Sequence, residues 1–196
     1  MPRPLEHNRE DVINAAMQVF WDKGYSATSM TDLKAATGLN PGSLYSSYQS
    51  KESLFLATLE FYCEKSIENL KNTLMHDTQY IRNIYQFFEN FEENYMPDGD
   101  VSKGCFFVNT LIEMSPHNPK VKDLLATYTE RYQNTFVLAL EKAKELKEIN
   151  AKEDVALIAQ QLMLTIWGLR VMHRSGLLRN TKTIVIQQLN DIFKAI

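Results

Sequence analysis

Apolar residues recur along this chain at intervals of three and four, which is the spacing of one face of an α-helix. The first such segment starts at Val12 and ends near Lys23, just before Gly24, a residue that commonly ends a helix. No segment shows the sustained alternation of apolar and polar residues that indicates a strand. The pattern therefore predicts an all-α protein.

Short helices and sharp turns are predicted between residues 24 and 51. Ser29 and Asp32 have the spacing of a capping box and open a helix that Gly38 ends. Asn40 can cap the next helix, with Pro41 at its first position, where a missing N–H costs nothing. These signals predict a compact N-terminal module of three helices.

The later helices are longer, as expected for a helical bundle. Periodicity and cap signals place them at about 51–74, 78–95, 103–114, 119–147, 151–174 and 180–193. Asn150 and Glu153 are the cap signature for the helix over 151–174. About nine helices result, divided into an N-terminal module over 1–52 and a bundle over 53–196, with the helix from about Lys51 as the connector.

Charge and composition narrow the function classes. The formal net charge is −3, and the first 52 residues hold five basic and six acidic side chains. Any affinity for nucleic acid must therefore come from placed contacts rather than from a basic field. The two cysteines form no CxxC pair and no residues have metal-ligand spacing, so we expect no metal and no cofactor.

Location and membrane contact are also constrained by the pattern. The N-terminus is charged and lacks the apolar run of a signal peptide. The most apolar stretch, 155–172, is interrupted by Gln160, Gln161 and Arg170, which predicts a buried helix rather than a membrane span. We expect a cytoplasmic protein without membrane contact.

The segment from Ser29 to Lys51 has the organisation of a helix-turn-helix, in which two short helices are joined by a tight turn. Leu33 and Leu39 can pack inward, whereas the second helix presents small polar residues and Tyr45 on its outer side. A short helix with small side chains can enter the major groove and bring its backbone near the bases. The segment therefore predicts binding to double-stranded DNA.

This segment closely resembles the tetracycline-repressor (TetR) family of bacterial regulators. The resemblance is detailed from Arg9 to about Tyr62, and beyond that it covers only the number and length of helices. The matching residues are Thr31, Ala35, Gly38, Leu39, Ser43, Leu44, Tyr45, Tyr48, Lys51, Glu52 and Leu54. The resemblance implies a ligand-responsive transcription regulator, usually a homodimeric repressor, which leaves a pseudo-palindromic operator when a small apolar or aromatic effector binds.

The resemblance also implies roles for individual residues. Thr31 would bind a phosphate, Gly42 and Ser43 would approach base edges, and Tyr45 would contact a phosphate or a thymine methyl group. Lys51, at a helix N-terminus, would meet a phosphate.

Some positions of the motif favour other readings. Leu44 and Tyr48 are expected in the core rather than at the DNA, and Ser46 and Ser47 could form a solvated face. The chain departs from the usual pattern at Pro41, where many members have Lys, and at Ser47, where many have His. Each departure removes a candidate phosphate contact.

In such proteins the C-terminal helices dimerise and enclose a ligand pocket. The last two helices hold dense apolar positions that one small chain does not readily cover, namely Val155, Ile158, Ala159, Leu162, Ile166, Leu169, Ile184, Leu189 and Ile192. We expect a two-fold homodimer through them. The candidate ligand-binding residues are aromatic, or polar among apolar neighbours: Phe88, Phe91, Phe107, Asn109, Tyr128, Trp167, Arg170 and His173.

Several alternatives stay open for these residues. The aromatic side chains could be ordinary core, and Glu113 could form an internal pair with Arg170 or His173. Cys105 resembles a modifiable cysteine of some TetR members and is a possible thiol sensor, since Lys103 and a helix N-terminus would favour its thiolate. The favoured alternative is a small buried residue, and Cys63 is expected to be inert.

Two other function classes compete with a regulator. An enzyme is not supported, because the chain has no metal spacing, nucleophile elbow or phosphate loop. A ligand carrier that has kept the fold but lost DNA binding is compatible with the near-neutral N-terminal module. A salt-titrated DNA-binding assay separates the carrier from the regulator.

Overall fold

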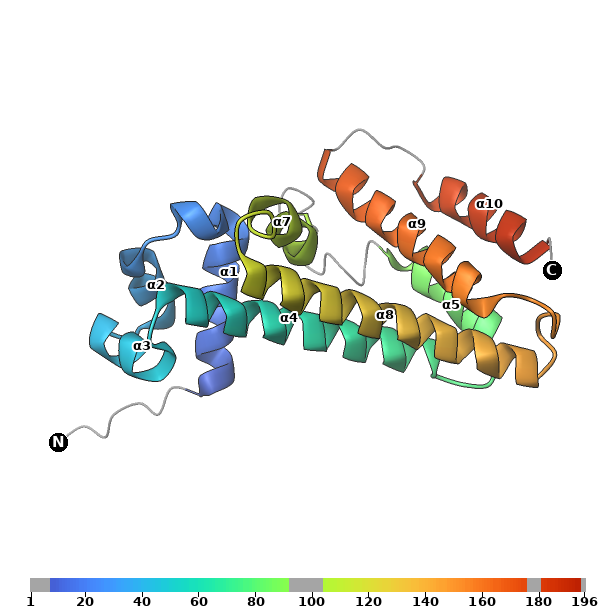
Figure 1. Ribbon diagram of the computed structural model, residues 1–196, viewed down its shortest axis with the longest axis horizontal. Helices are drawn as coiled ribbons and strands as arrows, with labels where there is room; N and C mark the ends of the chain where they lie inside the picture. Colours follow the sequence, from blue (N-terminus) through green and yellow to red (C-terminus); the bar gives the residue numbers. More distant parts are fainter. Residues whose placement is uncertain (1–7, 92–103, 176–180, 195–196) are drawn as a thin grey trace.

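The computed structural model describes residues 8–91, 104–175 and 181–194 of the 196-residue chain. Within these ranges the regular structure is entirely helical, which confirms the predicted fold class. The nine helices of this part, labelled as in Figure 1, are α1 (Arg9–Ala27), α2 (Met30–Thr37), α3 (Pro41–Tyr48), α4 (Lys51–Leu74), α5 (Tyr80–Glu89), α7 (Phe106–Glu113), α8 (Pro119–Glu145), α9 (Val155–Ser175) and α10 (Thr181–Lys194).

Two long helices, α4 and α8, run the length of the molecule and link its two ends (Figure 1). Helices α1–α3 gather at one end, and α9 and α10 lie toward the other. The Asn118 amide, at the start of α8, donates a hydrogen bond to Glu52 at the start of α4. Farther along, Arg131 of α8 donates one to Glu64 of α4. The two helices therefore run in the same direction.

The turns of the N-terminal module form as its sequence predicts. The Ser29 hydroxyl accepts a hydrogen bond from the Asp32 N–H at 3.1 Å, and the Asp32 carboxylate accepts one from the Ser29 N–H at 2.9 Å. Gly38 adopts the left-handed φ of 69° that ends α2. Asn40 caps α3 by accepting a bond from the Ser43 N–H at 2.8 Å. The boundaries of α2 and α3 are thus set by local side-chain bonds.

Helix α1 differs from the prediction beyond Lys23. Its regular path breaks at Gly24, which has a φ of 77°, but one more helical turn follows to Ala27. The new turn begins with unsatisfied N–H groups, and the carboxylate of Glu113 accepts bonds from two of them. A contact from a distant helix therefore extends α1, which sequence periodicity could not show.

Helix α9 begins later than expected. The predicted cap at Asn150 is wrong, because Asn150 accepts a bond only in the preceding turn, from the Lys152 N–H. Asp154 provides the cap instead, accepting bonds from the backbone N–H groups of Ala156 and Leu157 at 3.1 Å each. The helix therefore starts at Val155.

Two apolar clusters form the core of the described part. The first joins α1, α2 and α3 to the first half of α4, to α7 and to the start of α8, with Phe20, Phe55 and Phe106 fully buried at its centre. The second joins the end of α4 with α5, α8, α9 and α10. Helix α1 of the N-terminal module is thus packed directly against α7, and the domain boundary proposed at residue 52 stays a prediction.

One helical window, Val155–Met172 in α9, is long and apolar enough by composition to span a membrane. Half of this window is buried inside the molecule. That degree of burial is typical of a core helix, as the sequence predicts.

Candidate DNA interface and ligand pocket

The helix predicted to read DNA presents one aromatic side chain to solvent. Tyr45 is 47% exposed, whereas its neighbour Leu44 is 1% exposed and lies in the first apolar cluster. Tyr48 is half-buried and packs against the same cluster. Leu44 and Tyr48 therefore hold α3 in place, as predicted, and Tyr45 is available to a partner.

The N-terminus of α3 has little side-chain bulk at Gly42 and is accessible to solvent there. Gly42 is exposed, and a Cβ added there would lie 3.3 Å from the side-chain oxygen of Asn40. That oxygen accepts a hydrogen bond from the backbone N–H of Ser43, a half-buried residue. The absence of a side chain at Gly42 lets the cap close tightly and leaves the backbone open to a close approach.

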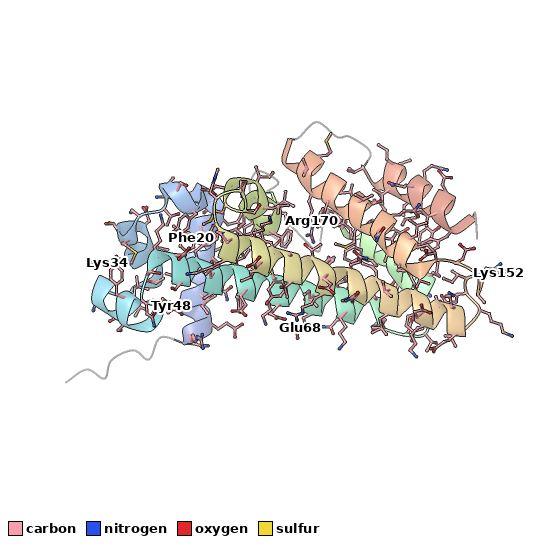
Figure 2. All side chains as sticks on the ribbon, in the orientation of Figure 1. Phe20, Lys34, Tyr48, Glu68, Lys152 and Arg170 are labelled. Carbon is pink, nitrogen blue, oxygen red and sulfur yellow. The ribbon has the colours of Figure 1, made fainter. Side chains whose placement is uncertain are left out.

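Two lysines near the predicted DNA-reading helix, Lys34 and Lys51, differ in how exposed they are. Lys51 is half-buried, and its ammonium lies 4.4 Å from the centre of the Tyr25 ring. Lys34 is exposed on α2, three residues after the exposed Thr31 (Figure 2). Residues three apart share a helix face, so Lys34 is a candidate phosphate contact that sequence reasoning missed and that its spacing from Thr31 could have revealed.

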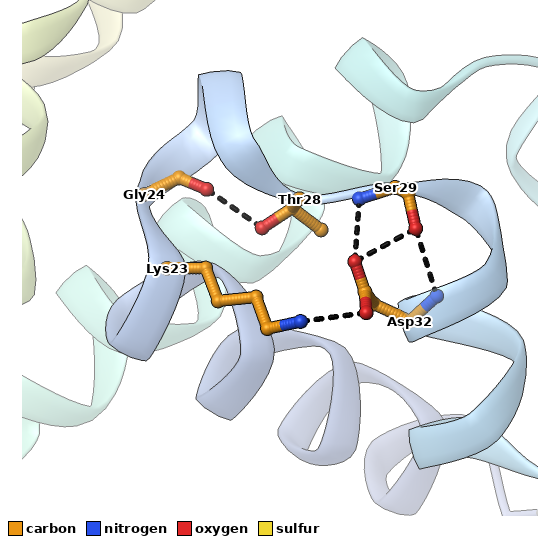
Figure 3. A network of polar contacts seen from close by, with 5 residues as sticks. All are labelled: Lys23, Gly24, Thr28, Ser29 and Asp32. Carbon is orange, nitrogen blue, oxygen red and sulfur yellow. Dashed lines mark hydrogen bonds and ion pairs between the residues drawn. The ribbon is translucent and has the colours of Figure 1, made fainter.

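A polar network holds α2 against α1 (Figure 3). Asp32 accepts bonds from the Lys23 ammonium at 2.6 Å and from the Ser29 hydroxyl at 2.7 Å, in addition to the Ser29 N–H. The Lys23 bond, followed by those from Ser29, holds the pKa of the Asp32 carboxyl well below its ordinary value. The Thr28 hydroxyl donates to the Gly24 carbonyl at 2.6 Å and fixes the link between the helices.

Four of the candidate ligand-binding residues meet at one pocket between α4, α7, α8 and α9. Phe107, Tyr128, Trp167 and Arg170 line it. The cavity between the lining side chains is small, about 20 Å³. The other lining residues are Tyr62, Cys63, Ser66, Ile67, Thr129, Tyr132 and Met163.

The pocket is aromatic with one charged side chain among its described lining residues. Arg170 is 6% exposed and lies where α9 faces α8 (Figure 2). Its guanidinium donates to the Tyr132 hydroxyl at 3.3 Å. The Tyr128 hydroxyl donates to Glu64 at 2.7 Å, and burial together with this carboxylate raises the pKa of Tyr128 far above its ordinary value. The chemistry of the lining favours an apolar or aromatic ligand that also has a polar group, and the lining side chains would have to move apart to admit it.

The remaining ligand candidates are not brought to this pocket. Phe88 and Phe91 pack between α5, α9 and α10, beside Leu169 and Val185. Asn109 lies on α7, at a groove beside α1. The side chain of His173 lies outside the described part of the chain.

Sequence reasoning missed the α4 side of the pocket, formed by Tyr62, Cys63, Ser66 and Ile67. Tyr62 and Ser66 are four residues apart on one helix face, which is the signal that could have revealed it. The internal pair expected between Glu113 and Arg170 is wrong. The Glu113 carboxylate accepts bonds from α1, and Arg170 bonds Tyr132.

Both cysteines are buried. Cys105 is the residue before α7, and its sulfur lies 3.4 Å from the Tyr62 hydroxyl. Burial raises the pKa of the Cys63 thiol far above its ordinary value, in keeping with an inert residue. Lys103 lies outside the described residues. A thiol-sensing role for Cys105 stays a prediction that its burial does not favour.

An apolar stripe on α9 faces solvent. Leu157, Leu164 and Val171 follow one another at seven-residue spacing and are all exposed, Leu164 by 70%, and Ile184 on α10 is exposed as well. Most of the residues predicted to need a dimer partner are instead buried within the chain's own core: Val155, Ile158, Ala159, Leu162, Ile166, Leu169 and Leu189. An unpaired apolar face remains: Ile184 is a predicted residue that belongs to it, whereas the exposed residues of α9 are not those predicted.

Comparisons with known proteins agree with this geometry. Residues 12–58 match the family of bacterial regulatory proteins called tetR, and residues 80–185 match the tetracyclin repressor-like C-terminal domain. The HTH-type transcriptional repressor ComR of Escherichia coli is 28% identical over 174 residues, which cover 89% of this chain and 83% of ComR.

Solved structures show the same fold. A TetR-family transcriptional regulator from Cytophaga hutchinsonii superposes with a TM-score of 0.83 at 24% identity, covering 96% of this chain and 94% of that one. A cysteine mutant of the regulator CifR, complexed with 26 bp double-strand operator DNA, superposes with a TM-score of 0.82 at 22% identity, covering 95% and 97%.

Proposed function

Since the chain belongs to the TetR family of helix-turn-helix transcription regulators, we propose that it is a homodimeric repressor that a small effector releases from its operator. The observation that most supports this is α3, a capped helix whose buried Leu44 anchors it and whose exposed Tyr45 faces outward. Relatives named as repressors, such as ComR, and the operator complex of CifR support the same reading.

The proposed DNA contacts divide by type. Gly42, Ser43 and Tyr45 at α3 would face the major groove, where base edges differ between sequences. Thr31 and Lys34 on α2 would bind phosphates. Lys51 would add a phosphate contact from its position over Tyr25.

The proposed dimer uses the apolar stripe of α9 together with α10. A second copy would cover Leu157, Leu164 and Val171, which would otherwise leave apolar surface in water. A two-fold dimer also places two α3 helices on one face of a DNA duplex, which explains why a pseudo-palindromic site is expected.

Selection from a random pool of DNA duplexes tests the function. We expect enrichment of a pseudo-palindrome whose half-sites lie about one turn of DNA apart, or a small multiple of it. Its affinity should fall linearly with salt on logarithmic axes. A pool that shows no enrichment, or a single unrepeated half-site, would contradict the proposal.

The effector is proposed to occupy the pocket lined by Phe107, Trp167 and Arg170. The chain has two tryptophans, so a Trp21→Phe variant leaves Trp167 as the only reporter of this pocket. A compound that binds there should change the Trp167 fluorescence and weaken binding to the selected duplex. A Trp167→Phe variant should lose the change caused by direct contact with the compound, and any change that remains comes from Trp21, whose ring lies 5.9 Å from that of Phe106 on α7.

The proposal also covers where the protein acts and whether it catalyses a reaction. A regulator of this kind acts in the cytoplasm, where its DNA is, and it needs no catalytic activity. The described residues contain no group of three or more histidine, cysteine or acidic side chains that could hold a metal ion. A purified protein that turned over its effector would contradict this part.

A further inference from the structure

A carboxylate of α7 accepts hydrogen bonds from the last turn of α1. Glu113, the last residue of α7, accepts a bond from the Tyr25 N–H at 3.2 Å through one oxygen and from the Ser26 N–H at 3.0 Å through the other. These two N–H groups begin the helical turn that follows the break at Gly24, so they have no partner within that turn. The carboxylate acts as the cap that this turn otherwise lacks.

Gly24 makes the contact possible. Its φ of 77° is disfavoured for other residues, and a Cβ added there would lie 2.9 Å from one Glu113 oxygen. The break in α1 and the approach of Glu113 therefore depend on the same glycine.

The held residue, Tyr25, also supports a proposed DNA contact. The Lys51 ammonium lies over its ring at 4.4 Å, and the ring packs edge-on against Phe55 at 5.0 Å. Burial and then the charge of Glu52 raise the pKa of the Tyr25 hydroxyl, so the ring stays neutral. A displacement of the Tyr25 backbone would move the ring and the ammonium above it.

The other end of α7 reaches the ligand pocket. Phe107 lines that pocket, with its ring 6.3 Å from the ring of Trp167. Phe107 and Glu113 are six residues apart on one helix, about 9 Å at a rise of 1.5 Å per residue. A ligand that displaces Phe107 would therefore move Glu113 as part of the same rigid helix.

We propose that Glu113 is a positioning residue that transmits the state of the pocket, through Tyr25, to Lys51. This inference rests on the proposed function. The bond to the Tyr25 N–H, at 3.2 Å, lies at the long end of the usual range, whereas the bond to the Ser26 N–H, at 3.0 Å, has an ordinary length. A shift of α7 would therefore break the Tyr25 bond first. The Lys51 ammonium then loses the Tyr25 ring that positions it, and the affinity of the protein for DNA phosphates falls.

A double-mutant cycle tests the link without knowledge of the effector. Phe107→Ala perturbs α7 at the pocket, Glu113→Gln removes one of the two acceptors, and the third protein has both changes. The probe is the duplex selected by the wild-type protein. We expect Phe107→Ala to change its Kd by about tenfold or more when Glu113 is present, and by less than about twofold when Gln replaces it.

The chain offers a matched control. The Glu148 carboxylate makes the same two-amide contact, with the N–H groups of Tyr80 and Ile81 at 3.1 and 2.8 Å, at the start of α5 and far from the DNA module. Glu148→Gln should leave both the Kd and the response to Phe107→Ala unchanged. Hydrogen exchange of the Tyr25 and Ser26 amides should accelerate in Glu113→Gln and in Gly24→Ala, but not in Glu148→Gln.

The outcomes are distinguishable. If the wild-type protein selects no duplex, the proposed function fails. If it selects one and the two changes are additive, or Phe107→Ala alone has no effect, or Glu148→Gln behaves like Glu113→Gln, only the inference about Glu113 is overturned. Phe107→Leu replaces Phe107→Ala if the double variant does not fold.

Discussion

Tyr45 and Leu44 are neighbours on α3 that face opposite environments, and they allow DNA binding to be separated from folding. Leu44→Ala removes a fully buried side chain, which should cost about 2–5 kcal/mol of the free energy of unfolding. Tyr45→Ala removes a side chain that is 47% exposed, which should cost about 0.5 kcal/mol or less. The two variants should therefore differ clearly in thermal unfolding.

The effect of Tyr45→Ala on operator binding should come from a lost DNA contact and not from a loss of folding stability. A hydrogen bond from Tyr45 to a phosphate would contribute about 1.5 kcal/mol or more, because its acceptor is charged. A dimer loses this bond twice, about 3 kcal/mol in total, and each 1.4 kcal/mol is a tenfold change in Kd. Folded Tyr45→Ala should therefore bind the selected duplex about a hundredfold more weakly.

Fluorescence anisotropy with the selected duplex, together with thermal unfolding, measures both quantities on the same preparations. Tyr45→Phe keeps the ring and removes the hydroxyl, so it should show most of the loss if the contact is to a phosphate and little if it is to a thymine methyl group. Binding of Tyr45→Ala within about threefold of wild type, or unfolding as easy as that of Leu44→Ala, would refute the assignment of α3 as the reading helix.

Three further predictions concern charge and assembly. Lys34→Gln should make the logarithmic salt dependence of operator binding shallower by about 0.9 for each protomer, measured by anisotropy over a salt series, and an unchanged slope would exclude a Lys34–phosphate contact. Leu164→Glu, at a position 70% exposed, should give a folded monomer in sedimentation; a dimer of unchanged strength would place the interface elsewhere. Because bonds from Lys23 and Ser29 lower the folded-state pKa of Asp32 below its ordinary 3.8, their stabilisation is complete above that pH and is lost as the pH falls through the lower folded value. Thermal unfolding of wild type should therefore approach that of Asp32→Asn in acid, and a constant gap between them would contradict this.

The parts of the fold that could be predicted from the sequence are those fixed by local bonds. The capping box of Ser29 and Asp32, the left-handed Gly38 and the Asn40 cap each depend on residues within four positions of one another. The start of α9 was missed because Asn150 and Asp154 are both acceptable caps. The choice depends on tertiary contacts, since the Lys144 ammonium bonds the Glu153 carbonyl at 2.9 Å and holds the preceding turn outside the helix.

The pocket could be predicted only in part, for a different reason. Phe88 on α5 and Phe107 on α7 have similar apolar neighbours in the sequence, but Phe88 packs against Phe136 in the core while Phe107 lines the pocket. Periodicity identifies the apolar face of a helix but not what that face meets. The contact of Glu113 with α1 is still less predictable, because it joins residues 87 and 88 positions apart.

The charges of the N-terminal module bear on why a dimer is needed. Its near-neutral sequence holds few cations, and the Lys23 ammonium is already bonded to Asp32 at 2.6 Å while that of Lys51 lies over the Tyr25 ring. Since affinity from counterion release grows with the number of phosphates neutralised, a single module of this kind should bind DNA weakly. Two linked modules add their contact energies for one loss of translational freedom. An effector then needs only to weaken the contacts that each module makes, and the proposed movement of α7, acting through Tyr25 on Lys51, would remove one phosphate contact from each protomer.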